Sequence, residues 1–315
     1  MTAGNARSGP PTTAGLVVRG LTQERRWAIV VLENSVDELL DGRPVRRRAL
    51  LTPETRDVYW ADPFPFRDGR GRLWIFVEEL HRWTGLGSIV ALRVEGDAVA
   101  ERRTVLSGRH HYSFPQVQLW DGTIVATVES CDPRARTYTF AEVGGPWLPT
   151  LRTVPIGVID PALAMDGDDW FLLGTSGSDY FAGFRQWQAE FGVGFVEQPE
   201  LRYRDAALAR SAGNADVNRG IRSVQDCREN YGIATALTTW SPSQVGPGEV
   251  LRRLNGSDVH PQALGTHTLT WTPDGQVVVA DVWARGPQPL SAVHRLAERR
   301  HGRFCAGRRL SAHMP

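Results

Sequence analysis

A repeated pattern of apolar and polar positions runs along most of the chain. In each copy a polar residue heads a short strand of alternating residues, a tight turn follows, and an apolar strand ends in small or charged residues. The clearest copy spans residues 158–176. By subtraction, the heading residues of the five copies lie 45 to 62 positions apart: Asp62, Ser113, Asp160, Arg222 and His267. Periods of roughly 40 to 50 residues built from short strands indicate the blades of a β-propeller.

Tight turns inside the copies support the same fold. Asp-Gly pairs supply the positive φ angles that two-residue hairpin turns require, and they have apolar runs on both sides: Asp68-Gly69, Asp121-Gly122, Asp166-Gly167 and Asp274-Gly275. The fourth copy uses residues 229–232 instead. Hairpins of one kind at similar spacing favour a propeller over a two-sheet sandwich. The predicted fold class is therefore all-β, a single five-bladed β-propeller.

A strand that precedes the first full copy predicts how the ring closes. Residues 27–33 are mostly apolar, and in a closed propeller such a strand joins the last blade, because closure removes exposed strand edges. We therefore expect residues 21–290 to form a propeller closed by an N-terminal strand. Residues 1–20 are predicted to be a disordered tail, since Gly, Pro, Ala, Thr and Ser are abundant there. Residues 291–315 are predicted to be a peripheral C-terminal tail.

Composition excludes several classes of function. The 315 residues carry a formal net charge of +1 and are 41% hydrophobic, which is ample for a large core and gives no broad basic excess for a nucleic-acid partner. The sequence has no stretch of about 18 apolar residues, so no membrane span is predicted. The sequence contains no lysine, which excludes Schiff-base chemistry through lysine and a Walker-type phosphate loop.

The cysteines and the first residues bear on location. Cys131, Cys227 and Cys305 do not have the spacing of a metal site, and the first fifteen residues lack the apolar core of a signal peptide. Buried or idle thiols in a reducing compartment fit these features better than a disulfide framework. The predicted location is the cytoplasm.

The candidate chemistry lies where the repeats begin. The innermost strand of every blade lines the axis of a propeller, so the heading residues are expected to converge. Asp62 and Asp160 are the strongest candidates, because each follows a hydrophobic residue and precedes a proline. Two carboxylates facing one another push their proton affinities apart, as acid–base catalysis requires. For any single heading residue, capping of a turn or binding of water is the alternative.

These residues resemble a known group of enzymes. Ala61-Asp62-Pro63 and Ile159-Asp160-Pro161, with the five-blade period, look like the five-bladed β-propeller glycosidases, which include arabinanases, xylosidases and, more distantly, invertases. The resemblance implies that Asp62 activates water and that Asp160 tunes and orients. It also implies a further glutamate that acts as the general acid.

A closer resemblance is to the propeller domain at the N-terminus of plant glucosamine inositolphosphorylceramide transferases and to its free-standing bacterial relatives. It covers roughly residues 58–283 and implies the same fold. The motifs that carry it run in order along the chain: residues 61–66 with 74–79, 112–117 with 129–130, 211–213, 222–227 with 231–232, and 265–268.

The expected acid of blade four is replaced in this chain. Where the glycosidases carry a glutamate, Arg222 and Gln225 are present, and Glu129 is the substitute acid candidate. The alternative for Glu129 is a surface carboxylate that pairs with a nearby arginine. The planar donors of Arg222 suit a carboxylate or phosphate group of a substrate. Bracing of Asp226 is the alternative role for Arg222.

The histidines complete the candidate set. His267 either ligates a metal such as calcium, as the matching histidine does in some glycosidases, or shuttles protons. No other cofactor and no other metal site are predicted. Adjacent strand residues point to opposite faces, so at most one of His110 and His111 reaches the site, and His111 is the candidate. The predicted substrate-binding residues are Ser113, Arg222, Gln225, Asp226, His267, Glu79 and His111.

The leading prediction is a glycosidase-like enzyme that hydrolyses or transfers a glycosidic or related sugar bond with paired carboxylates in an axial pocket. Its partner is a small-molecule substrate that contains sugar or is anionic. One alternative is a non-catalytic module that binds a sugar or an anionic metabolite. Another is a biosynthetic enzyme that rearranges or cyclises a non-sugar substrate in the same pocket.

Overall fold

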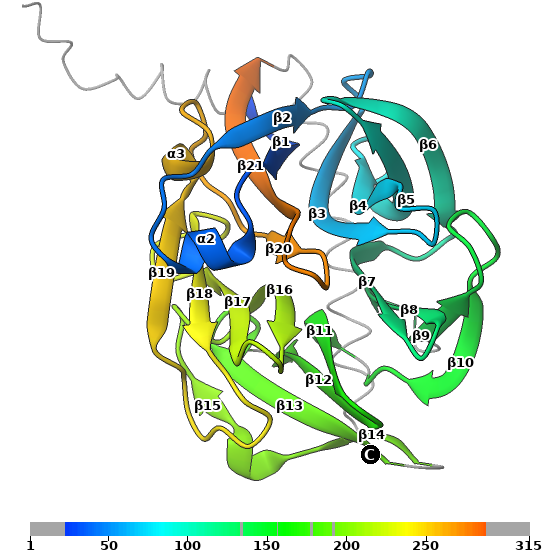
Figure 1. Ribbon diagram of the computed structural model, residues 1–315, viewed down its shortest axis with the longest axis vertical. Helices are drawn as coiled ribbons and strands as arrows, with labels where there is room; N and C mark the ends of the chain where they lie inside the picture. Colours follow the sequence, from blue (N-terminus) through cyan, green and yellow to red (C-terminus); the bar gives the residue numbers. More distant parts are fainter. Residues whose placement is uncertain (1–22, 133–134, 156, 177–178, 191–192, 288–315) are drawn as a thin grey trace, which may run out of the picture.

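Five antiparallel sheets surround a common centre and form a five-bladed β-propeller, as the sequence predicts (Figure 1). The computed structural model describes residues 23–132, 135–155, 157–176, 179–190 and 193–287. In Figure 1 the first strand of each blade, β3, β7, β11, β16 or β20, lies nearest the centre. Both predicted tails, residues 1–20 and 291–315, lie outside the described residues, so their bounds stay predictions.

The blades follow one another along the chain. Blade I consists of β3 (Val58–Arg67), β4 (Leu73–His81), β5 (Leu86–Glu95) and β6 (Ala98–Leu106). Blade II consists of β7 (Tyr112–Trp120), β8 (Thr123–Ser130), β9 (Arg136–Phe140) and β10 (Leu148–Thr153). Blade III consists of β11 (Val158–Asp166), β12 (Asp169–Ser176), β13 (Gly183–Glu190) and β14 (Gly194–Glu197), with β15 (Tyr203–Arg204) paired to β13. Blade IV consists of β16 (Ser211–Asp216), β17 (Ile221–Asp226), β18 (Ala234–Thr239) and β19 (Val250–Asn255).

Blade V joins the two ends of the propeller. It consists of β20 (Leu269–Trp271), β21 (Val278–Pro287), β1 (Gln23–Leu32) and β2 (Arg47–Leu51). Antiparallel pairing of β1 with β21 places Trp27 opposite Trp283 and confirms the predicted closure by an N-terminal strand. The short helices lie in connections between strands: α2 (Val36–Leu40), the 3-10 helix η2 (Pro199–Leu201) and α3 (Gly256–Val259).

The innermost strand of blade IV differs from the prediction. Arg222 was expected to head this strand, but it lies on β17, the second strand of the blade, and β16 is innermost. The sequence of β16, Ser-Ala-Gly-Asn-Ala-Asp, has no large apolar residue, so it lacks the signal of a strand. The buried strand β17 has that signal and was taken for the first strand of its copy.

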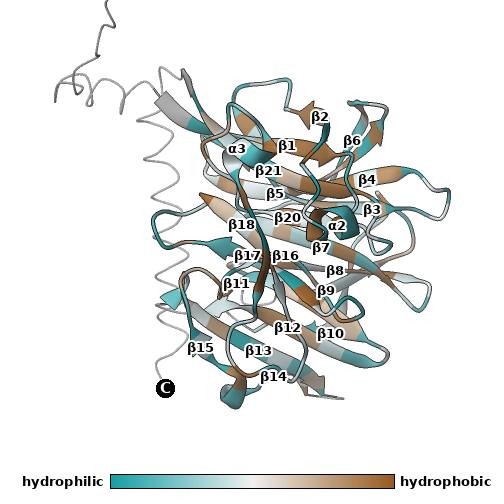
Figure 2. Ribbon diagram, turned by 60° about the vertical axis from the view of Figure 1, so that its left-hand side comes forward, coloured by the Kyte–Doolittle hydropathy of each residue, from teal (hydrophilic) through white to brown (hydrophobic). Residues whose placement is uncertain are grey.

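The core lies between the blades, where their apolar faces meet. Phe64 of blade I and Phe114 of blade II pack edge to face at 4.9 Å. Trp120 of blade II and Trp170 of blade III do the same at 5.1 Å. Figure 2 shows the apolar colouring concentrated on strands and the hydrophilic colouring on connecting loops. This packing fixes each sheet against its neighbours and so holds the innermost strands in place around the axis.

Two further findings concern location. Among the described residues no helix is long and apolar enough to cross a membrane. Cys131 is disulfide-bonded, whereas Cys227 is a free cysteine. The expectation of idle thiols is therefore wrong for Cys131. The cytoplasmic location stays a prediction.

Candidate active site

Strained backbone marks the heads of three innermost strands. The pairing register of β3, β7 and β11 with the next strand shifts near their starts. At each shift a residue that precedes a proline has a positive φ, which is 50° for Asp62, 50° for Phe114 and 49° for Asp160. Proline has no N–H to donate to the ladder, and such a φ costs a non-glycine residue roughly 1 to 3 kcal/mol. Residues held under such strain cluster at functional sites.

The equivalence of these three residues corrects the expectation for blade II. Phe114, and not Ser113, stands where Asp62 and Asp160 stand in their blades. Ser113 is paired with Glu129 across the β7/β8 ladder. The side chain of Phe114 is fully buried, and its backbone N–H donates to Oδ2 of Asp62 at 3.2 Å. Blade II therefore contributes a backbone hydrogen-bond donor to Asp62, and not a polar side chain, at this position.

Asp62 is a buried carboxylate that cationic and neutral donors surround. The Thr268 hydroxyl donates to its Oδ1 at 3.0 Å, and Nε2 of His267 lies 3.0 Å from the same oxygen. Burial acts to raise the pKa of Asp62, but the charge of His267 and the hydrogen bonds from His267, Thr268 and Phe114 outweigh it. The net pKa is lowered, so Asp62 is ionised at neutral pH.

His267 bridges Asp62 to a second carboxylate on β21. Its Nδ1 lies 2.7 Å from Oδ2 of Asp281, in an ion pair and not an aligned hydrogen bond. The backbone N–H groups of His267 and Thr268 each donate to Oδ1 of Asp281 at 3.0 Å. Burial acts to lower the pKa of His267, but Asp281 and Asp62 raise it to about 10. The imidazole is therefore positively charged at neutral pH.

Asp160 is held by side chains of blade IV. Nε of Arg210 and Nε2 of Gln225 both donate to its Oδ2, at 2.6 and 2.7 Å. Among the described residues no hydrogen bond reaches Oδ1. Burial is the largest cause that raises the pKa of Asp160, and Glu129 and Asp62 add to it, while Arg210 opposes them. The pKa rises to about 7.

Two arginines of blade IV have different tasks. The guanidinium of Arg210, just before β16, lies over the ring of Tyr231 at 4.8 Å as well as against Asp160. Arg222 donates from Nη2 to the backbone carbonyl oxygens of Leu208 and Ala209, at 2.5 and 2.9 Å. Arg222 therefore supports the segment that carries Arg210. Arg210 is the one that reaches the carboxylate of blade III.

Glu129 lies beside Asp160. Its Oε2 accepts the backbone N–H of Asp160 at 3.0 Å. Asp281 has the same relation to Asp62, whose backbone N–H donates to Oδ2 of Asp281 at 3.1 Å. A carboxylate from a neighbouring blade thus supports each aspartate in its strained conformation.

Aromatic rings frame this group. The ring of Trp27 lies 4.2 Å from that of His267, and the ring of Tyr231 meets His267 edge-on at 5.2 Å. Phe181 lies 6.3 Å from Tyr231. The site therefore combines charged groups with apolar ring surfaces. We call the group of Asp62, Asp160, Arg210, Gln225 and His267 the axial site.

One part of the axial site has the composition of a metal site. Donor atoms of Asp62, His267 and Asp281 all lie within 4.8 Å of one another. Calcium takes six to eight oxygen ligands, whereas this group offers one nitrogen and carboxylates, a set that suits a transition metal better. Both ring nitrogens of His267 already face carboxylates, and a metal would have to replace one of these contacts. A metal near His267 stays a prediction.

Three predicted residues are engaged elsewhere. Glu79 accepts hydrogen bonds from Nε1 of Trp60 and Nε of Arg102, both at 3.0 Å and both within blade I. Asp226 pairs with Arg228 at 2.7 Å and also with Arg253. Arg222 therefore does not brace it.

The third of these residues contacts blade I. Nδ1 of His111 accepts the backbone N–H of Gly87 at 3.0 Å, and its Nε2 lies 3.4 Å from Oε1 of Glu78. Like the contacts of Glu79 and Asp226 described above, these two contacts of His111 involve neither Asp62 nor Asp160. The axial site therefore does not include Glu79, Asp226 or His111, which the sequence had predicted to bind the substrate.

The sequence did not single out Arg210, Thr268 or Asp281. A sequence signal for Asp281 did exist, because it is a lone carboxylate within the apolar run 277–283. In the structure it is completely buried. Such a charge requires a partner. Arg210 and Thr268 left no such signal, since their importance depends on which blades are neighbours.

The comparisons with known proteins concern the fold. No protein-family model matches the chain, and no curated protein matches it. Among solved structures, CoXyl43, a β-xylosidase/α-arabinofuranosidase from a compost microbial metagenome, is 13% identical over 75% of this chain and 92% of its own, with a TM-score of 0.49. The Bacillus subtilis arabinanase Arb43A is 13% identical over 70% and 92%, with a TM-score of 0.45.

A third solved structure is the α-L-arabinofuranosidase PaAbf62A from Podospora anserina, in complex with cellotriose. It is 10% identical over 75% of this chain and 94% of its own, with a TM-score of 0.48. Similarity at this level of identity concerns the course of the chain alone. The resemblance to glucosamine inositolphosphorylceramide transferases stays a prediction, because no family model matches.

Proposed function

We propose that the protein is an enzyme that cleaves or transfers a glycosidic or related sugar bond at the axial site. The observation that carries this proposal is that the pKa values of two carboxyl groups at equivalent positions are shifted in opposite directions. The pKa of Asp62 is lowered, while that of Asp160 is raised to about 7. Two carboxyl groups that differ in this way divide the roles of base and acid between them, as glycoside hydrolysis requires.

Asp160 is the proposed proton donor. With a pKa of about 7 it keeps a proton in a large fraction of molecules at neutral pH. Arg210 and Gln225 occupy Oδ2, so the proton resides on Oδ1. Donation from Oδ1 to the leaving oxygen of the sugar bond leaves a carboxylate that Arg210 stabilises. Glu129, 3.0 Å from the Asp160 backbone nitrogen, is the second candidate for this role.

Asp62 is the proposed base or nucleophile that works with the proton donor Asp160. It is ionised, and the donors that keep it so hold its carboxylate in a fixed orientation. An ionised carboxylate either accepts a proton from water or attacks the sugar carbon directly. These two routes give inversion or retention at that carbon. NMR of the first product formed from a β-glycoside distinguishes them.

The aromatic frame supports a sugar ring as the ligand. Rings of Trp27, Tyr231 and Phe181 border the charged group. Aromatic faces with hydrogen-bonding groups beside them suit a body that has both C–H faces and hydroxyl edges. Arg210 and His267 add positive charge, which also suits an acidic sugar.

Turnover of a panel of aryl glycosides by the wild-type protein, Asp62→Asn and Asp160→Asn tests the proposal. Loss of turnover in both variants is expected. Asn tolerates the positive φ of these positions, so the change removes charge with little change of backbone. Asp121→Asn is the matched control, because Asp121 also has a positive φ, 44°, but lies in an exposed hairpin turn.

The outcome that contradicts the proposal is equal turnover in all three variants. Absence of turnover with tight calorimetric binding of an intact sugar would support the binding module instead. A new product from a non-sugar substrate, lost in both axial variants, would support the rearranging enzyme.

A further inference from the structure

Tyr231 lies in the connection between β17 and β18 and contacts partners of both proposed carboxylates. The guanidinium of Arg210, which binds Asp160, lies 4.8 Å from the centre of the Tyr231 ring. The ring of His267, which pairs with Asp62, lies 5.2 Å from it. A single ring therefore contacts a cationic partner of each carboxylate.

Hydrogen bonds alone do not fix the direction of Arg210. Its Nε donates to Oδ2 of Asp160 at 2.6 Å, but Nη1 and Nη2 donate to no acceptor among the described residues. Nη2 of Arg222, by comparison, donates to two backbone carbonyl oxygens. The guanidinium of Arg210 instead lies 4.8 Å from the ring of Tyr231 and 5.7 Å from that of Phe181. Because aromatic rings attract a guanidinium within about 6 Å, these rings supply the missing support.

Blade V holds the connection that carries Tyr231. Nη1 of Arg25 donates to the backbone carbonyl oxygen of Tyr231 at 3.3 Å, and Nε1 of Trp283 donates to that of Gly232 at 2.6 Å. Gly232 has a φ of 70°, and a Cβ at this residue would lie 2.9 Å from the ring of Trp27. Glycine therefore suits this close approach of the backbone. The neighbouring blade thus sets the position of the Tyr231 ring.

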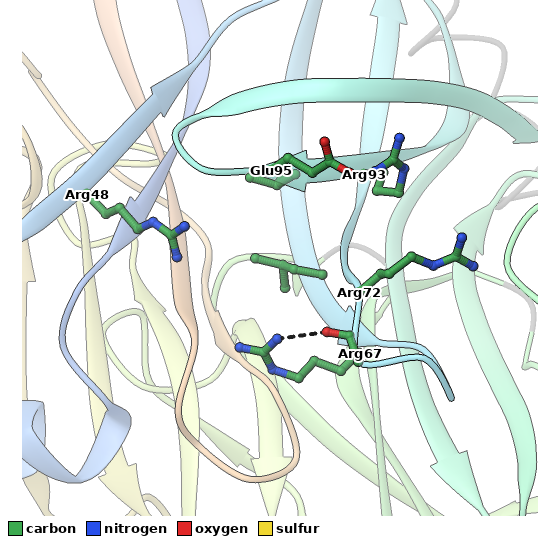
Figure 3. Close-up of a pocket in the computed structure, with 8 residues that line it drawn as sticks. Arg48, Arg67, Arg72, Arg93 and Glu95 are labelled. Carbon is green, nitrogen blue, oxygen red and sulfur yellow. Dashed lines mark hydrogen bonds and ion pairs between the residues drawn. The ribbon is translucent and has the colours of Figure 1, made fainter.

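Blade I contains a similar combination of aspartate, arginine and ring, which is held differently. Arg72, one of the arginines around the cavity in Figure 3, pairs with Asp68 at 2.7 Å and lies over the ring of Trp74 at 5.9 Å. Asp68 and Trp74 are only six positions apart, so a single hairpin brings these groups together, and the Arg72 side chain is 43% exposed. Arg210 is 50 positions from Asp160, and its side chain is only 9% exposed. No local hairpin holds Arg210, so its orientation depends on contacts made by other segments.

We propose that Tyr231 is a positioning residue, whose ring holds the guanidinium of Arg210 against Asp160. The proposal rests on the proposed role of Asp160 as proton donor. While Nε of Arg210 stays on Oδ2, the proton of Asp160 resides on Oδ1, from which it is passed to the leaving oxygen. The hydroxyl of Tyr231 is not needed for this task, because the ring alone attracts the guanidinium.

Several charged and titratable groups act on Asp160 and bear on any test. They come from blades I, II and IV: Asp62, Glu129, Arg210, Cys227 and Tyr231. Burial raises the pKa of Cys227 to about 11 and that of Tyr231 well above its ordinary value of 10, so both groups are neutral near pH 7. Arg210 stays charged, and its charge lowers the pKa of Asp160. A change in the position of Arg210 should therefore change that pKa.

NMR titration of the Asp160 carboxyl carbon, assigned by its absence in Asp160→Asn, tests the proposal without a substrate. In Tyr231→Leu the side chain keeps most of its apolar cover but offers no ring to Arg210. The pKa of Asp160 should then rise by about half a unit, because the charge that lowers it is held less firmly. Tyr231→Phe keeps the ring and should leave the pKa unchanged. Tyr59→Leu, the matched control, should also leave it unchanged, because Tyr59 is a half-buried tyrosine whose ring lies 5.1 Å from a different buried arginine, Arg82.

A double-variant cycle shows whether Tyr231 acts through Arg210. Adding Tyr231→Leu to Arg210→Gln should move the pKa of Asp160 no further than Arg210→Gln alone does. Thermal unfolding confirms that each variant is folded, and Tyr231→Met replaces Tyr231→Leu, with the same expectations, if the leucine variant does not fold.

Four results would overturn the proposal. They are a pKa of Asp160 that does not rise in Tyr231→Leu, an equal rise in Tyr231→Phe, an equal rise in Tyr59→Leu, and a rise that persists in full on the Arg210→Gln background. Turnover of glycosides is a separate measurement. If no glycoside is turned over but the pKa responds as expected, the proposed function fails while the positioning of Arg210 by Tyr231 stands.

Discussion

The heads of blade I and blade III begin from the same local sequence and end with opposite chemistry. Asp62 and Asp160 each follow an apolar residue, precede a proline and have a φ near 50°. Both are almost completely buried. Yet the pKa of Asp62 is lowered and that of Asp160 is raised to about 7. Local sequence therefore places the two carboxylates but does not set their proton affinity.

Neighbouring blades make the difference. Blade V gives Asp62 a charged histidine and a hydroxyl donor, and blade II gives it a backbone N–H. Arg210 and Gln225 donate hydrogen bonds to one oxygen of Asp160. The negative charges of Glu129 and Asp62 nevertheless raise its pKa. A single repeated motif can thus supply a base and an acid, once unlike blades flank its copies.

Asp62→Asn should have the largest effect on this comparison. We expect turnover to fall about a thousandfold or more, because the ionised partner of the reaction is lost. His267 then keeps only Asp281 as a carboxylate partner, so the pKa of His267 should fall below about 10. NMR titration of the imidazole measures that shift. An unchanged imidazole pKa would show that Asp62 does not govern the charge of His267.

Asp160→Asn should reduce turnover about a hundredfold and change its dependence on pH. Wild-type activity should fall as pH rises through about 7, since Asp160 then loses its proton. The variant should not show this limb. If the limb persists there but disappears in Glu129→Gln, Glu129 is the acid.

The same group affects stability with a definite sign. The folded protein holds the proton of Asp160 to higher pH than the unfolded chain does, so this group's contribution is present below the ordinary pKa of 3.8 and is lost as pH rises to about 7. Unfolding temperatures at pH 5 and pH 8 should therefore differ more for the wild type than for Asp160→Asn. An equal difference in both would contradict the raised pKa.

Arg210→Gln should have a smaller effect on rate and a clear effect on pH dependence. Arg210 lowers the pKa of Asp160, so its removal should move the alkaline limb of activity upward by about one unit or more. Gln225→Met removes a neutral donor from the same oxygen and should move the limb less. A shift of the limb to lower pH in Arg210→Gln would contradict the assignment of Asp160.

The sequence predicted the ring and part of the site for one physical reason, which is that both depend on local repeats. Asp-Gly hairpins and apolar strands gave five blades, and the motif around Asp62 and Asp160 gave two carboxylates. Blade IV was misplaced because its innermost strand has only small and polar residues. Arg210 and Asp281 could not be predicted, since they matter only through contacts with a different blade.

The smallest effect is expected from removing one hydroxyl group beside Asp62. It tests whether the hydrogen bond from Thr268 sets the pKa of Asp62. Thr268 and Thr270 are both completely buried, and their hydroxyls donate to Oδ1 of Asp62 at 3.0 Å and to the carbonyl oxygen of Pro63 at 2.5 Å. Replacing either with valine should cost about 1 to 2 kcal/mol of stability. Only Thr268→Val should raise the pKa of Asp62 and move the acid limb of activity to higher pH. If Thr270→Val moves the limb equally, the hydroxyl of Thr268 does not tune Asp62, and packing alone explains both results.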